Sequence, residues 1–178
     1  MKQTRKTQTK KLIFASLMAA LVCVSTAVVK IPLPLGYVNL GDAFVIAAAF
    51  LLSPLYGFLA AGIGSCMADL FLGYAIYAPV TFVIKGAMVL VVCGVLKLYK
   101  LDKRPLSGQI LAGFLAELLM VLGYYLFEGI LYGFGAALAS VPFNAVQGAM
   151  GLALGLLLVR VLKSDRLREF RDLFEKND

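Results

Sequence analysis

The sequence predicts an all-α integral membrane protein built from six transmembrane helices. Hydrophobic residues make up 61% of the 178-residue chain and charged residues only 15%, whereas soluble domains are about half apolar. The apolar residues form long continuous runs and not the alternating pattern of barrel strands. Because backbone groups in lipid have no water to bond to, such runs are expected to be helices.

Six apolar runs are candidates for crossing a bilayer, which takes about 20 residues of helix. The second is short, and Ser53-Pro54 separates it from the third because proline disfavours helix at the residue before it. We expect those two runs to form a tight hairpin. The chain, 1–178, is then a single domain with a basic tail at 1–11 and a charged tail at 164–178. The six predicted spans are 12–29, 40–52, 55–72, 80–98, 108–127 and 141–162.

The positive charge is concentrated beside the ends of the predicted helices. Residues 1–11, 97–104 and 160–176 hold 15 of the 17 Lys and Arg residues, and the net charge is +7. This placement indicates membrane orientation more than binding to nucleic acid. An even number of spans and the positive-inside rule put both termini in the cytoplasm, so 30–39, 73–79 and 128–140 are expected to face outward.

Polar side chains within the spans gather toward their outer ends, judged by a rise of about 1.5 Å per residue. Ionisable groups in a membrane are costly, and they pair with each other or mark a ligand path. Groups from five segments at a similar depth favour a pocket for a small, flat, polar molecule. We therefore predict a substrate-binding site formed by Asn39, Asp42, Asp69, Tyr77, Lys85, Glu117, Tyr124, Asn144 and Gln147.

The stretch 31–42, IPLPLGYVNLGD, is predicted to be the lid of this pocket. Its prolines stiffen a turn between two apolar runs, and Asn39 and Asp42 would lie at the pocket rim. Glu117, deeper in its span, would form the floor. Asn144 and Gln147, one helical turn apart on one face, would form the far wall.

Simpler interpretations exist for several of these groups. Asp69 and Lys85 could be a structural ion pair between the third and fourth spans. Asn144 and Gln147 could supply hydrogen bonds between helices. Five tyrosines at the same level also fit an ordinary interfacial belt. They are Tyr37, Tyr74, Tyr77, Tyr124 and Tyr125.

Small residues recur at four-residue spacing in three predicted spans. Ala15 and Ala19 form an AxxxA motif in the first span; Gly57, Ala61 and Ser65 repeat the spacing in the third, as do Gly151 and Gly155 in the sixth. Such ridges let helices approach closely, either within the fold or against a partner. For Ala15 and Ala19 both interpretations stay open.

Motifs for catalysis, cofactors or metals are missing from the sequence. There is no histidine, the commonest general base and metal ligand. There is also no GxxxxGK[ST] motif for ATP. Cys23, Cys66 and Cys93 each lie alone in an apolar run, which is typical of small core residues. We expect no catalytic residue, no cofactor and no metal site.

Several motifs together resemble the S components of energy-coupling factor (ECF) vitamin transporters. They are the basic N-terminus, the AxxxA of Ala15 and Ala19, GYVNLGD at 36–42, LLSPLYGFLAAGIGSCMADLFLGY at 51–74 and APVTFVIKG at 78–86. The likeness covers nearly the whole chain and is greatest to the branch with hydroxymethylpyrimidine and pyridoxine binders. The chain has no tryptophan, unlike the thiamine and some riboflavin binders.

The resemblance implies a substrate-binding subunit in the cell membrane of a prokaryote, not an enzyme. Such a subunit captures a water-soluble vitamin or precursor from outside and works with a transmembrane coupling subunit and two ATPase subunits. It further implies that Ala15 and Ala19 pack on the coupling subunit. An alternative is a self-sufficient proton-coupled secondary transporter that uses Glu117, Asp69 and Lys85 as a relay.

Overall fold

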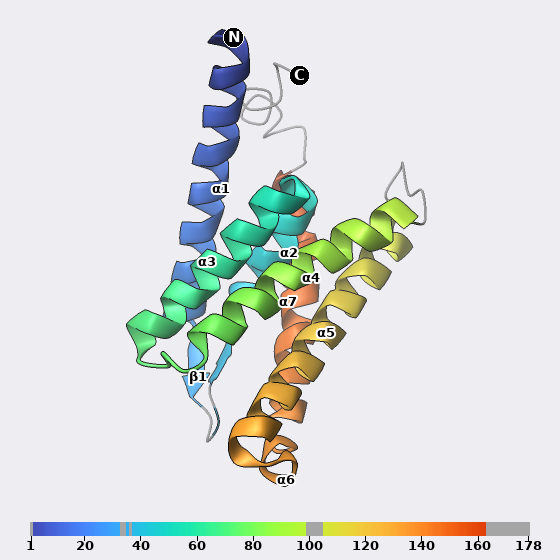
Figure 1. Cartoon of the computed structure of the whole chain (residues 1–178). Helices are drawn as coiled ribbons and strands as arrows, with labels where there is room; N and C mark the ends of the chain where they lie inside the picture. The colour runs from blue at the N-terminus through green and yellow to red at the C-terminus, as the bar shows by residue number, and fades with distance from the viewer. Residues whose placement is uncertain (1, 33–34, 36, 99–104, 163–178) are drawn as a thin grey trace.

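The computed structural model describes residues 2–32, 35, 37–98 and 105–162. The described chain is helical apart from one small hairpin, as the sequence predicts (Figure 1). Five helices are long and apolar enough to cross a membrane. The elements are α1 (Lys2–Val28), β1 (Lys30–Pro32), β2 (Tyr37–Asn39), α2 (Gly41–Leu51), α3 (Pro54–Leu72), α4 (Ala78–Leu98), α5 (Leu106–Tyr132), α6 (Phe134–Ala137) and α7 (Val141–Leu162).

Helix α2 differs from the transmembrane span predicted at 40–52. It has 11 residues and is about 16 Å long, roughly half of a bilayer core. Nine of the 11 are buried, so α2 is apolar on all sides because the other helices surround it. By length, the described chain therefore has five candidate spans and one half-length central helix.

The lid predicted at 31–42 is a two-stranded antiparallel hairpin. Strand β1 pairs with β2 in the register Lys30 to Asn39, Ile31 to Val38 and Pro32 to Tyr37. The amide of Leu40 extends the pairing by donating to the carbonyl of Val29 at 3.3 Å. The sequence predicted the lid but not its strands, and Pro34 and Gly36 of the predicted turn lie outside the described residues.

The ends of α2 and α3 follow local sequence signals. The predicted break at Ser53-Pro54 is confirmed, because α2 ends at Leu51 and α3 begins at Pro54. Helix α3 ends at Gly73, whose φ of 83° is the left-handed conformation that favours glycine at a helix C-terminus. Its amide bonds back to the carbonyl of Leu70.

The outward segment predicted at 128–140 is mostly helical. Helix α5 continues to Tyr132, five residues beyond the predicted end at residue 127, and the short helix α6 follows. The predicted span ends before Glu128, and a carboxylate is a costly residue in a membrane. In the structure Glu128 is only 2% exposed, so burial against other polar groups removes that objection.

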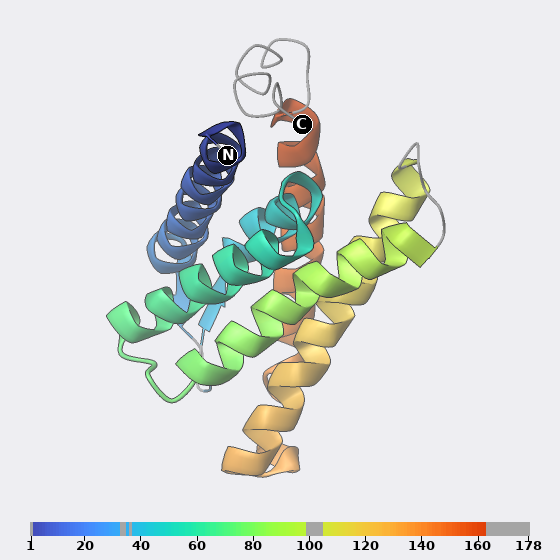
Figure 2. The same ribbon diagram turned by 45° about the horizontal axis from the view of Figure 1, so that its top comes forward.

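The long helices pack on one another at several interfaces. Helix α3 contacts both α1 and α4, α4 also contacts α5, and α7 packs on α2 and α5 (Figures 1 and 2). A Cβ added at Gly64 of α3 would lie 2.4 Å from the carbonyl oxygen of Ala19, and one at Gly151 of α7 would lie 2.5 Å from Cβ of Asp42. Glycine at these two positions lets helix backbones approach within the fold.

The two ends of the bundle differ in chemistry. The start of α1 and the end of α7 lie at one end, and the β1–β2 hairpin and α6 lie at the other (Figure 1). An apolar cluster of Ala, Val, Ile and Met residues forms the core between the helices. The buried polar residues of α3, α4 and α7 lie toward the hairpin end, where they meet the strand residues Tyr37 and Asn39.

Large apolar side chains cover the outer faces of the long helices. Examples are Leu12 at 58% exposed, Phe71 at 69%, Phe114 at 55% and Ile130 at 78%. Exposure on this scale suits a surface that contacts lipid. The basic segment 99–104 and the charged tail predicted at 164–178 lie outside the described residues.

Candidate functional site

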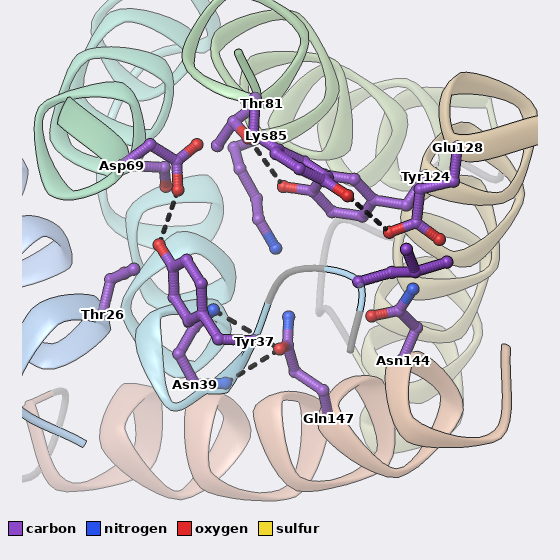
Figure 3. Close-up of a pocket in the computed structure, with 13 residues that line it drawn as sticks. Thr26, Tyr37, Asn39, Asp69, Thr81, Lys85, Tyr124, Glu128, Asn144 and Gln147 are labelled. Carbon is purple, nitrogen blue, oxygen red and sulfur yellow. Dashed lines mark hydrogen bonds between the residues drawn. The ribbon is translucent and has the colours of Figure 1, made fainter. Parts of the chain in front are cut away.

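An open cavity lies between the β1–β2 hairpin and the ends of five helices (Figure 3). The empty space in and above it is about 440 Å³ with open solvent included, but only about 30 Å³ can hold the centre of a water-sized molecule. Helix α7 contributes one wall, α4 and α5 a second, and α1 and α3 a third. The lining residues are Thr26, Leu35, Tyr37, Asn39, Ser65, Asp69, Tyr77, Thr81, Lys85, Tyr124, Glu128, Asn144 and Gln147.

A buried ion pair lies at the base of the cavity. The Lys85 ammonium bonds to Oδ1 of Asp42, and the two side chains are 3% and 0% exposed. Asp42 stands in the first turn of α2, where the helix dipole favours a negative charge. The amide Nε2 of Gln147 donates to the second oxygen, Oδ2, at 2.6 Å. The carboxylate is therefore bonded on both oxygens, as a buried charge requires.

This ion pair corrects two predictions. Lys85 pairs with Asp42 of α2 rather than with Asp69 of α3, so the proposed structural pair between Asp69 and Lys85 is wrong. Asp42 is fully buried behind the cavity wall and is not at its rim. Both errors arise because position along a helix gives depth in the membrane but not the direction in which the side chain points.

Hydrogen bonds from two strand residues fasten the hairpin over the cavity. The hydroxyl of Tyr37 donates to Oδ1 of Asp69 at 2.6 Å. The backbone N–H and the side-chain Nδ2 of Asn39 both donate to Oε1 of Gln147, at 2.9 and 3.4 Å. These bonds join strand β2 to α3 on one side and to α7 on the other (Figure 3).

Local chemistry sets the conformations of these strand residues. Oδ1 of Asn39 accepts the backbone N–H of Gly41 at 2.8 Å, a short-range bond that Asn favours before a helix. Burial, and then the nearby Asp69 carboxylate, raise the pKa of Tyr37. The phenol is therefore neutral and available as a donor at physiological pH.

Aromatic rings form a continuous row beside the hairpin. The ring centroids are 4.9 Å apart for Tyr37 and Tyr74, 6.3 Å for Tyr74 and Tyr77, and 5.3 Å for Tyr77 and Phe127. Deeper in the cavity, the Lys85 ammonium lies 5.5 Å from the ring centre of Tyr124, within range of a cation–π contact. Rings of this kind can stack on a flat ligand.

The hydroxyl of Tyr124 lies 3.1 Å from that of Thr81, and either can donate. Tyr124 and Thr81 come from α5 and α4, so this contact joins the two helices at the cavity wall. The sequence predicted Tyr124 but not Thr81, because a threonine within a span is not a costly residue and gives no signal.

Glu128 is a cavity residue that the sequence prediction missed. Its Oε1 accepts from the Tyr77 hydroxyl at 3.3 Å, and its Oε2 accepts from the hydroxyl of Ser140. Burial, followed by the effects of Tyr132 and Glu128, raises the pKa of Tyr77. The signal available in the sequence was a carboxylate only one residue beyond a predicted span.

Glu117 does not form the cavity floor. It is 5% exposed, does not line the cavity, and neither carboxylate oxygen has a hydrogen-bond partner among the described residues. It lies against α7: Cβ atoms added at Gly148 and Gly151 would be 3.2 and 3.0 Å from its oxygens. Glu117 is therefore a buried acid behind the ion pair, close to Asp42 across Gly151.

Seven of the nine predicted site residues line the cavity, and Asp42 and Glu117 lie behind its wall. Tyr37 was expected at this level only as an interfacial tyrosine. Thr26 and Ser65 are small hydroxyl residues that gave no signal of their own, and Leu35 is apolar. The lining residues absent from the predicted site are Thr26, Leu35, Tyr37, Ser65, Thr81 and Glu128.

The AxxxA motif lies at the interface of α1 with α3. Ala15 is only 6% exposed, and the carbonyl of Ala19 faces Gly64 of α3. Ala15 is therefore buried within the fold, whereas Ala19 stays partly exposed. The exposed face of α1 at the same level carries Ser16 and Ala20.

Comparison with known proteins decides the family. The sequence profile described as "ECF-type riboflavin transporter, S component" matches residues 6–164. The chain belongs to the ECF-type transporter S components. These are the substrate-binding subunits of ECF transporters, so this S component is a multi-pass membrane protein that serves transport and not catalysis.

Two similar proteins match most of the chain. A Pyrococcus woesei protein with the name "Uncharacterized protein in gap 3'region" is 39% identical over 144 residues, which is 80% of this chain and 94% of the relative. A solved structure described as "Structure and mechanism of the S component of a bacterial ECF transporter" superposes with a TM-score of 0.71 at 23% identity. The match covers 92% of this chain and 98% of the other, and shows a shared fold.

Proposed function

We propose that this S component captures a small, flat, polar heterocycle, a water-soluble vitamin or vitamin precursor, in the cavity beneath the β1–β2 hairpin. The observation that carries the proposal is the double fastening of the hairpin. Tyr37 bonds to Asp69 and Asn39 bonds to Gln147, and all four residues also line the cavity. A ligand that contacts these residues therefore also determines whether the hairpin is closed.

Two substrate groups are considered within this proposal. The sequence motifs favour a hydroxymethylpyrimidine or pyridoxine type of ligand, and the description of the matching family names riboflavin. Each has a flat ring with hydrogen-bond donors and acceptors. Such a ring suits a cavity with aromatic residues at its mouth and amide, carboxylate and ammonium groups inside.

We infer distinct roles for the predicted site residues. Asn144, Gln147 and Lys85 would bond to polar ring atoms, and Tyr77 and Tyr124 would contact the ring faces. Asn39 and Asp69 would link the ligand to the closed hairpin. Asp42 and Glu117 would act from behind the wall, Asp42 by holding Lys85 and Gln147 in place.

The membrane orientation is also a proposal. We infer six membrane passes, with α2 as the short second pass inside the bundle, and both termini in the cytoplasm of a prokaryotic cell. The cavity then opens outward. Reporter fusions at residue 178 and within the 128–140 segment test this orientation: a cytoplasmic signal from the first and an external signal from the second are expected.

We further propose that the protein assembles with a transmembrane coupling subunit and two ATPase subunits through α1. Ser16→Trp or Ala20→Trp, on the exposed face of α1, should disrupt co-purification with a coupling subunit and leave ligand binding intact. Ala15→Trp, on the buried face, should instead destabilise the isolated protein. Disrupted co-purification by Ala15→Trp in a protein of normal stability would return the partner contact to the AxxxA motif.

Proton-coupled transport by this chain alone is the alternative, and the buried unpartnered Glu117 is the feature that favours it. The apolar cluster between the helices offers no continuation of the relay toward the other end of the bundle within the described residues. Proteoliposomes that contain only this chain test the alternative. Uptake driven by a proton gradient would establish it and replace the ECF proposal.

Native mass spectrometry of the purified full-length protein tests the binding proposal. We expect a 1:1 complex with a carried-over or added heterocycle from a panel of riboflavin, pyridoxine and hydroxymethylpyrimidine. Gln147→Ala should weaken the complex, whereas Ser25→Ala, whose hydroxyl bonds only to the carbonyl of Val22 on α1, should not. Equally weak binding of all three compounds by the wild type, Gln147→Ala and Ser25→Ala would contradict a specific site.

A further inference from the structure

The α1–α3 wall of the cavity carries buried polar atoms without partners. Among the described residues, Oδ2 of Asp69, Oγ of Ser65 and Oγ1 of Thr26 make no hydrogen bond. The side chains of Asp69, Ser65 and Thr26 are 3%, 1% and 3% exposed, and all three residues line the cavity. Buried polar atoms nearly always have hydrogen-bond partners in native proteins. We therefore expect another molecule to supply the missing partners of these three atoms.

Asp69 is the strongest of the three acceptors. Its Oδ1 already accepts from the Tyr37 hydroxyl at 2.6 Å, and its second oxygen, on the side of Thr81 in Figure 3, has no hydrogen-bond partner among the described residues. Ser65 stands four residues earlier on α3, so the two side chains share one helix face a turn apart. A carboxylate oxygen only accepts hydrogen bonds, and the group that fits beside it is therefore a donor.

The other carboxylate that lines the cavity has no unbonded oxygen. Glu128 has both oxygens bonded, one to Tyr77 and the other to Ser140. The Lys85 ammonium has its charge balanced by Asp42 behind the wall, and an ammonium carries three N–H donors. The cavity therefore presents an accepting side on α3 and a donating side on α4.

We propose that this subsite on α3, formed by Asp69 and Ser65, binds an amino group on the ring of the substrate, and that Lys85 binds an acceptor atom of the same ring. The inference rests on the proposed function and narrows it to heterocycles with an exocyclic amino group. The same Asp69 carboxylate joins this amino group to Tyr37 of the hairpin. Substrate recognition and closure of the lid thus share one side chain.

A pair of ligands that differ in one group tests the proposal. The probes are 4-amino-5-hydroxymethyl-2-methylpyrimidine and its 4-oxo analogue, in which a carbonyl acceptor replaces the amino donor, titrated into the purified full-length protein. A hydrogen bond to a charged group corresponds to roughly 10- to 100-fold in affinity. We expect the wild type to prefer the amino compound by about 10-fold or more.

Variants of the α3 residues test whether the preference for the amino compound comes from this wall. Asp69→Asn should reduce the preference to less than about threefold, and Ser65→Ala should reduce it less, as for a neutral hydrogen bond. Cys66→Ala, at the next position on α3 and outside the cavity lining, is the matched control and should keep the preference. Continued binding of the 4-oxo compound by Asp69→Asn verifies that the variant is folded.

The remaining outcomes overturn the inference. A wild type that prefers the 4-oxo compound would show that the α1–α3 wall donates a hydrogen bond to the ligand and does not accept one. An equal preference for the amino compound in wild type and Asp69→Asn would show that water, and not the ligand, bonds to the polar atoms of this wall. Binding of riboflavin or pyridoxine but of neither pyrimidine would also overturn the amino subsite and leave the proposed function standing, whereas binding of none of these four compounds would overturn both.

Discussion

The hairpin end of the bundle and the apolar core are held together by different forces. At the hairpin end, the ion pair of Lys85 and Asp42 and the amide of Gln147 connect α2, α4 and α7 through directed bonds. In the core, side chains such as Met88 and Val92, both 0% exposed, contact their neighbours only by apolar packing. Directed bonds can be exchanged for other bonds, for example to a ligand, whereas a close-packed core resists rearrangement. We therefore expect ligand response at the hairpin end and rigidity in the core.

The largest effect should follow from breaking the ion pair. Lys85→Met leaves Asp42 charged and buried without its cation, and such a loss costs about 3–5 kcal/mol of unfolding free energy. Thermal unfolding of the purified protein measures it. The double variant Lys85→Met/Asp42→Asn should recover part of the loss, and a double variant no more stable than the single one would show that the pair does not hold the helices together.

A change in the core should be nearly as large but should leave recognition intact. Met88→Ala removes a fully buried side chain from the apolar cluster, at a cost of about 2–5 kcal/mol. Thermal unfolding should show this loss, while the ligand dissociation constant at a temperature well below unfolding should change little. A large loss of affinity in Met88→Ala would contradict the separation between the two regions.

The third effect should combine stability and binding. Gln147→Ala leaves Oδ2 of Asp42 and the N–H of Asn39 without partners, and each such group costs about 1–3 kcal/mol. We expect a loss of about 3 kcal/mol and, unlike in Met88→Ala, weaker ligand binding with faster dissociation. Stopped-flow dissociation kinetics measure the second effect, and an unchanged dissociation rate would separate Gln147 from the lid.

The smallest effect should be a pH dependence at the hairpin. Burial and Asp69 raise the pKa of Tyr37, so the folded protein holds this proton at a pH where the unfolded chain, with a pKa of about 10, releases it. Stability should therefore fall as pH rises above about 10, and more steeply in the wild type than in Tyr37→Phe. Tyrosinate absorbance that titrates near pH 10 and is lost in Tyr37→Phe would contradict the buried bond.

Much of the fold could be predicted from the sequence because lipid imposes simple rules. Long apolar runs gave the helices, and the bounds predicted for the last one, 141–162, are those of α7. Length alone did not reveal that α2 is a half-length helix surrounded by others. The hairpin strands were missed because three-residue strands have no periodic pattern to detect.

The candidate site was predictable by depth but not by direction. Asn144 and Gln147 line the cavity because their spacing fixes a shared helix face. Lys85 had carboxylates at similar depth on two helices and bonds to Asp42 of α2, against which Gly151 lets α7 pack closely. The carbonyl of Ala19 lies against α3 for a related reason, since Gly64 admits the backbone of α1. Such contacts depend on how helices pack, which a single sequence does not specify.

Equilibrium binding to the purified protein tests the central claim most directly. Isothermal titration calorimetry with riboflavin, pyridoxine and hydroxymethylpyrimidine should show one ligand bound at 1:1, strong binding retained in Met88→Ala, and a clear loss of affinity in Gln147→Ala. This result would establish the cavity beneath the hairpin as the substrate site. Equal affinity in Gln147→Ala and the wild type would contradict it, as would the absence of binding of every compound by a folded wild type.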